Sequence, residues 1–181
     1  MNVKENTVKE TKTLEEIRKC FQSNDPLSAN KVLEWMRSDA IQVQAALVAL
    51  ISEHEDRIDP PLEGKTVFDF CLSYYKRSFL ENPSDGEFTG NRTVEGYDLQ
   101  KWFKDLWANR IGNMELIEEI KKMITETYKS GDDGFKYAIE TAVLEHLFEQ
   151  TDIANHFSDW QNDPILRPGY ERVREWKSSP S

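Results

Sequence analysis

The stretch from Gly134 to Trp160 constrains the fold most, because its pattern predicts a helix that is apolar on nearly every side. At helical spacing its side chains form two stripes on opposite faces, interrupted only by Lys136, Glu140, Glu145 and Glu149. A helix of this kind is usually the central one of a bundle. The first stripe holds Phe135, Ala138, Ile139, Ala142, Val143, His146 and Leu147, and the second holds Tyr137, Thr141, Leu144 and Phe148.

Further helices are predicted on both sides of this stretch, separated by turn regions. Thr13 and Glu16 form a capping box for a first helix, and the Asp25-Pro26 step is typical of the start of a second. Turn regions are expected at 54–64, where two prolines stop the helical pattern, and at 82–92. No run of residues alternates like a strand over more than a few positions. Predicted helices include 14–21, 26–37, 67–81, 94–109 and 113–129.

The expected fold is therefore all-α, an irregular helical bundle or a stack of helical hairpins with about seven to nine helices. Residues 1–12 alternate charged and polar side chains without an apolar core, which predicts a flexible arm rather than a signal peptide. Residues 13–177 are expected to form one helical domain, and 178–181 a tail. The longest strictly apolar run, 45–51, is far too short to span a membrane. We therefore expect a cytoplasmic protein.

Negative charge dominates the C-terminal half of the chain. The net charge is −10, and residues 115–163 carry 12 acidic side chains against 4 basic ones. Nucleic-acid binding is disfavoured, because contacts to phosphates need clustered Lys and Arg side chains. A cationic protein partner is favoured, since complementary fields accelerate encounter.

The predicted helix at 113–129 has the clearest division into an apolar and a polar side. Its acidic residues fall opposite the apolar ones and are expected to be exposed, either as a binding site or only to keep the protein in solution. Trp176, near the C-terminus, is the tryptophan expected to be exposed and available to a partner. The candidate partner-binding residues are Glu115, Glu118, Glu119, Glu126 and Trp176.

Candidate catalytic and metal-binding groups are sparse. No serine or cysteine nucleophile can be placed beside a histidine, and no glycine-rich loop could hold a phosphate. Asp152 and His156 are four residues apart, but no further His or Cys ligand lies nearby. His146 falls in the first apolar stripe, where both a structural and a functional role stay open. We expect no cofactor and no bound metal.

Paired carboxylates support one enzymatic alternative. Glu115 with Glu118, and Glu149 with Asp152, are each three residues apart and can share a helix face. All-α nucleoside triphosphate pyrophosphohydrolases place such pairs on neighbouring helices to hold magnesium, which would orient a triphosphate. The adjacent-glutamate motif of these enzymes is incomplete here. A magnesium-dependent hydrolase is therefore the alternative to a non-catalytic protein.

The segment from Val143 to Trp176 resembles the C-terminal part of small, acidic, all-helical bacterial proteins of unknown function. Small acidic helical proteins of bacteria include the immunity proteins that neutralise a secreted toxin in its producer. The resemblance implies a bacterial origin. Together with the acidic helix face, it leads to the hypothesis of an immunity-type inhibitor that covers a basic site on a toxin such as a nuclease. A structural adaptor is a further alternative.

Overall fold

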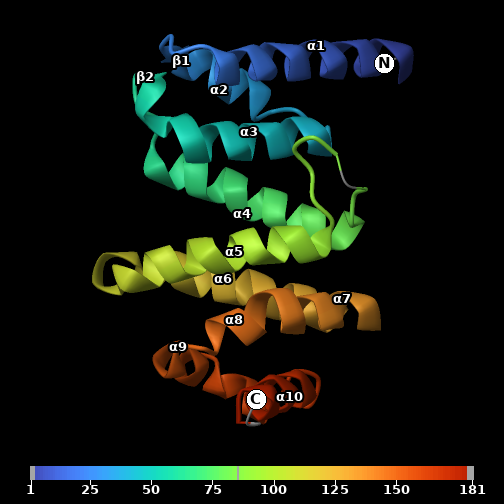
Figure 1. The fold of residues 1–181 in the computed structure, drawn as a ribbon, viewed down its shortest axis with the longest axis vertical. Helices are drawn as coiled ribbons and strands as arrows, with labels where there is room; N and C mark the ends of the chain where they lie inside the picture. The colour runs from blue at the N-terminus through green and yellow to red at the C-terminus, as the bar shows by residue number, and fades with distance from the viewer. Residues whose placement is uncertain (1–2, 85, 179–181) are drawn as a thin grey trace. The chain divides into compact units, whose positions relative to one another are not determined.

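The computed structural model describes residues 3–84 and 86–178, with side chains from residue 10 to 176 apart from residue 85. Most of these residues are helical, which confirms the all-α prediction (Figure 1). In chain order the elements are α1 (Val3–Gln22), β1 (Leu27–Ser28), α2 (Ala29–Trp35), α3 (Ile41–His54), the 3₁₀ turn η1 (Glu55–Arg57), β2 (Ile58–Asp59), α4 (Gly64–Glu81), α5 (Arg92–Ala108), α6 (Arg110–Ser130), α7 (Asp133–Ala138), the π-helical segment η2 (Ile139–Leu144), α8 (Glu145–Leu147), α9 (Thr151–His156), the 3₁₀ turn η3 (Ser158–Asn162) and α10 (Arg167–Ser178).

The first helix starts earlier than the capping box indicated. Helix α1 begins at Val3, so the backbone of most of the expected arm is helical rather than irregular. Lys and Glu, which recur in this segment, are good helix formers. Residues 1–2 of the predicted arm and residues 179–181 of the predicted tail lie outside the described chain.

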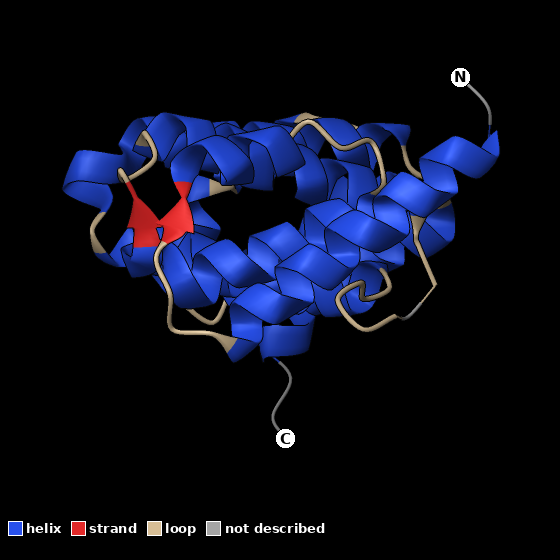
Figure 2. Cartoon of the chain, turned by 90° about the horizontal axis from the view of Figure 1, so that it is seen from above, coloured by secondary structure: helices blue, strands red, loops and turns tan. Residues whose placement is uncertain are grey.

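Two very short strands were not predicted. Leu27 pairs with Ile58 and Ser28 with Asp59 in a parallel ladder, drawn in red in Figure 2. Two residues are too few to give the alternation by which a strand is found in a sequence. The ladder also displaces the second helix, which begins at Ala29 rather than at the Asp25-Pro26 step.

The contacts within the chain group it into two compact units. The expectation of one helical domain over residues 13–177 stays a prediction. The first unit comprises the chain up to Tyr74 together with Pro83–Thr89, and the second comprises Tyr75–Asn82 together with the chain from Gly90 onward. In the first unit, helices α1 and α2 both pack on α3. Its buried apolar core consists of Ile17, Leu27, Ala29, Val32, Trp35, Val43, Ala46, Leu47, Leu50, Ile51 and Ile58.

In the second unit, α5 packs on α6 and on η2. Gly96 makes the approach to η2 possible, because a Cβ there would lie 2.7 Å from the Cβ of Ala142. Helix α10 packs on η2, α8 and η3. The fully buried side chains of this unit include Phe79, Leu99, Phe103, Ile117, Ile120, Ile124, Ile139, Val143, Leu147, Phe157, Trp160 and Val173.

The central stretch is helical and largely buried, as expected, but it is not one regular α-helix. Its middle is the π-helical segment η2, which a pattern of period 3.6 does not reveal. Three residues of the predicted stripes are not buried, and of these Thr141 is half-buried. The side chain of His146 is 32% exposed, and Tyr137 is 63% exposed. Within the described residues, no helix has both the length and the apolar composition needed to cross a membrane.

Candidate functional site

Helix α6 carries the four carboxylates that the sequence singled out, Glu115, Glu118, Glu119 and Glu126, and we call them the acidic face of α6. Glu115, Glu118 and Glu126 are exposed and Glu119 is half-buried. The opposite side of the helix is committed to the core, where Ile117, Ile120, Met123, Ile124 and Tyr128 are buried. This division follows the amphipathic pattern of the sequence.

The carboxylates of this face differ in how far the chain itself compensates them. Glu126 lies 3.7 Å from Nζ of Lys76 and 3.9 Å from Nζ of Lys122. The Glu118 carboxylate lies 3.5 Å from Nε2 of His156. Glu115 forms no ion pair with any residue whose side chain the structure describes. Negative charge is therefore least compensated toward the N-terminal half of α6.

Trp176 is 40% exposed and lies on α10. Of the other tryptophans, Trp35, Trp107 and Trp160 are buried and Trp102 is half-buried. Among the described residues, no hydrogen bond, ion pair or ring contact joins Trp176 to the acidic face of α6.

The second carboxylate pair expected for a hydrolase already has protein partners. Glu149 lies 3.1 Å from Nζ of Lys104. The Asp152 carboxylate accepts a hydrogen bond of 2.9 Å from Nε1 of Trp107, which lowers the pKa of Asp152 below its ordinary value. Among the described residues, no three His, Cys, Asp or Glu side chains lie close enough together to hold one metal ion.

Next to this pair lies His156, which is largely buried. Its ring lies 5.0 Å from the ring of Trp107, and its Nε2 atom is buried without a hydrogen-bond partner in the described structure. Burial, and then the charge of Lys121, lower the pKa of His156. The ring is therefore held neutral more firmly than in solution.

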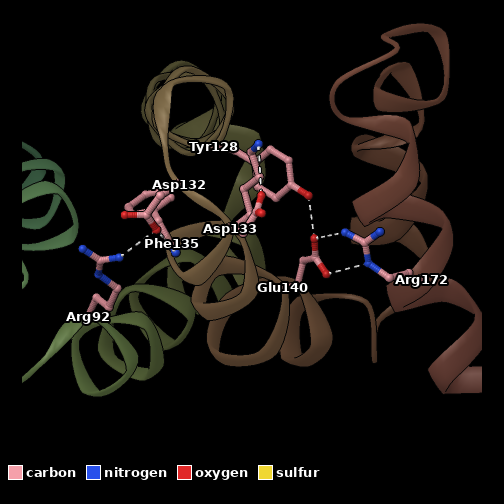
Figure 3. Close-up of polar contacts among 8 residues, drawn as sticks. Arg92, Tyr128, Asp132, Asp133, Phe135, Glu140 and Arg172 are labelled. Atoms are coloured by element: carbon pink, nitrogen blue, oxygen red, sulfur yellow. Dashed lines mark hydrogen bonds and ion pairs between the residues drawn. The ribbon is translucent and has the colours of Figure 1, made fainter.

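A buried polar cluster in the second unit was not foreseen from the sequence. Glu140, in η2, is 2% exposed, and its Oε1 atom accepts a hydrogen bond of 2.5 Å from the Tyr128 hydroxyl. Arg172, in α10, donates to both carboxylate oxygens, with distances of 2.6 and 3.0 Å. Figure 3 shows Tyr128 and Arg172 meeting Glu140 from two sides. The hydrogen bond to Glu140 raises the pKa of Arg172, and burial raises that of Tyr128.

Three donor groups occupy the two oxygens of Glu140, so this carboxylate serves best as a structural tie between α6, η2 and α10. A buried carboxylate without such partners would be costly. Its environment was hidden because Tyr128 and Arg172 are 12 and 32 residues away in the sequence. From the sequence alone, Glu140 is recognised only as a polar residue that interrupts the apolar stripes.

A second polar contact, also drawn in Figure 3, closes the N-terminus of α7. The Asp132 side chain accepts a hydrogen bond of 2.7 Å from the backbone N–H of Phe135 and caps the helix. Arg92 lies 3.5 Å from Asp132 and 5.3 Å from the ring centroid of Phe135. These contacts fix the start of the central stretch against α5.

The chain matches no protein-family model, no curated protein and no solved structure with which it was compared.

Proposed function

We propose that this chain is a non-catalytic, acidic binding protein, an immunity-type inhibitor that acts in the cytoplasm and covers a basic site on a cognate bacterial toxin. The acidic face of α6 would be the binding site. The observation that carries the proposal is the exposure of Glu115 and Glu118 on a helix whose other side is committed to the core. These side chains do not contribute to the core packing, and Glu115 has no cation of the described chain beside it.

Inhibition would follow from charge complementarity. The carboxylates of α6 would take the place of substrate phosphates on a basic active site and exclude the substrate. Charged faces of this kind raise the association rate and fix the orientation of a complex. The fold supports such a role, because a rigid helix backed by buried side chains presents its carboxylates without having to be ordered on binding.

The test uses the purified product of the reading frame immediately upstream of this chain's gene. We expect the triple variant Glu115→Lys, Glu118→Lys, Glu119→Lys to bind it at least about tenfold more weakly, chiefly through slower association at low salt. The control is Glu15→Lys, Glu53→Lys, Glu171→Lys, which changes the net charge equally at exposed positions elsewhere. Circular dichroism and thermal melting check that both variants fold.

Equal affinity of the two triple variants at about 20 mM and about 150 mM salt, where screening differs strongly, would remove the acidic face of α6 from the site. A neighbouring product that neither binds this chain nor is inhibited by it would contradict the immunity function itself.

A further inference from the structure

Two apolar side chains stand beside the least compensated carboxylates of α6. Ile111 is fully exposed, at 101%, and Met114 is 39% exposed. Together with Glu115 and Glu118 they occupy positions i, i+3, i+4 and i+7, which lie on one face of a helix. We call these four residues the Ile111–Glu118 stripe.

We infer that the Ile111–Glu118 stripe is a docking surface for a protein whose basic site is flanked by an apolar recess. Ile111 and Met114 fill the recess, and Glu115 and Glu118 meet the basic side chains beside it. The inference rests on the proposed function and adds to it the part of the contact that charge does not supply.

The stripe holds two unfavourable features that a single partner relieves. Water surrounds the Ile111 side chain, although burial of an isoleucine is strongly favourable. Glu115 repels Glu118 and Glu119, which lie three and four residues further along the helix. The first turn of α6 contains no acidic residue, so these carboxylates lie beyond the region where the helix dipole would favour them.

Charge complementarity selects the occupant. In a symmetric dimer of this chain the same patch meets itself, so Glu115 and Glu118 would face their own copies. A nucleic acid carries the same sign of charge as the stripe. A basic protein surface with an apolar contact matches both halves of the stripe, and methionine adapts readily to the shape of such a recess.

The experiment places the photoreactive amino acid benzoylphenylalanine at position 111 of the full chain in its source cells. After irradiation, the cross-linked protein is identified by mass spectrometry, purified, and titrated with the unmodified chain. Cross-linking of a protein does not by itself test the inference; the charge of that protein and its affinity for the variants do.

We expect a partner of net positive charge. It should bind the double variant Ile111→Ala, Met114→Ala at least about tenfold more weakly, as for truncation of a central interface contact. The control Val94→Ala, Ile165→Ala truncates two exposed apolar side chains outside the stripe and should change the affinity less than about twofold.

The outcomes separate the two proposals. If Glu115→Lys, Glu118→Lys weakens binding but the alanine pair matches its control, the acidic binding site stands and the apolar half of the stripe is overturned. If the charge reversals leave the affinity unchanged, the proposed function fails and the inference fails with it. A cross-link only to a second copy of this chain, or none above that obtained with the photoreactive residue at position 165, also overturns the inference.

Discussion

Gly169 stands where any side chain would collide with the buried polar cluster of Tyr128, Glu140 and Arg172. A Cβ at this position would overlap the Tyr128 hydroxyl and lie 2.9 Å from Oε1 of Glu140. The described glycines do not include one with positive φ, so at Gly169 it is space rather than backbone conformation that requires glycine.

We therefore expect Gly169→Ala to lower the free energy of unfolding by about 1–3 kcal/mol, through overpacking and displaced hydrogen bonds. The matched control is Gly112→Ala in α6, where a Cβ would meet no atom within 4 Å. That change should stabilise the protein by about 0.5–1 kcal/mol, because alanine is the better helix former. Urea denaturation of both variants measures the difference, and equal effects would mean that α10 does not press on the cluster.

His156 makes stability depend on pH. Lys121 and Glu118 face it from α6, Asp159 from η3 and Trp107 from α5, and burial is the main cause of its lowered pKa. Because the folded protein binds this proton less readily than the unfolded chain, stability is complete above the ordinary histidine pKa of about 6.5 and falls as the pH drops below it.

The measurement compares the melting temperature of the wild type and of His156→Gln between about pH 7.5 and about pH 5.5, the interval around the ordinary histidine pKa. The variant should lose less stability over this interval, since its amide does not titrate. Glu16, Asp152 and Asp163 have lowered pKa values and titrate at more acidic pH. An identical decrease in both proteins would show that His156 accepts the proton without cost in the folded state.

At the scale of elements, the central stretch is the clearest object for a stability test. Leu147, in α8, is fully buried, whereas Tyr137, in α7, is 63% exposed. Leu147→Ala should lower the free energy of unfolding by about 2–5 kcal/mol, through lost burial and the cavity that remains. Tyr137→Ala should change it by less than about 1 kcal/mol. Comparable losses, measured by chemical denaturation, would mean that the stretch is not central to the core.

Helix content and the buried side of each long helix could be predicted from the sequence, because both depend on local periodicity. Helix α6 was predicted with its correct apolar side, although it begins at Arg110 rather than after Asn113. The β1–β2 ladder, the π-helical segment η2 and the burial of Glu140 could not be predicted. The ladder and the burial of Glu140 depend on residues far apart in the sequence, such as the pairing of Leu27 with Ile58. The π-helical segment is not revealed by a pattern of period 3.6.

The candidate site, too, could be predicted from the sequence only in part. The exposure of Glu115, Glu118 and Glu126 follows from the pattern of α6 alone. Their degree of compensation does not, since the compensation of Glu126 depends in part on Lys76, in α4, far away in the sequence. The exposure of Ile111 was also missed, because this residue falls between the predicted helices 94–109 and 113–129, whereas α6 begins at Arg110.

At the scale of the whole molecule, a net charge of −10 makes electrostatic repulsion part of the stability of the fold. The repulsion is unevenly relieved along α6. Glu126 has two lysines within 4 Å, whereas Glu115 forms no ion pair among the residues with described side chains. Salt screens interactions of both kinds, because the Debye length falls to about 3 Å at 1 M.

This asymmetry predicts opposite effects of the same substitution at two positions of one helix. At low salt, Glu115→Gln should raise the free energy of unfolding by about 0.2–1 kcal/mol, since it removes repulsion across one turn. Glu126→Gln should lower it by a similar amount, because it removes two exposed ion pairs. Both differences should fade at about 1 M NaCl, and thermal melting at the two salt concentrations measures them.

If Glu115→Gln proves destabilising, the carboxylate stabilises the fold, and the acidic face of α6 loses its main support as a binding site. If it proves stabilising, the chain retains an acid that its own folding disfavours, which is the situation expected where a cationic partner supplies the compensation.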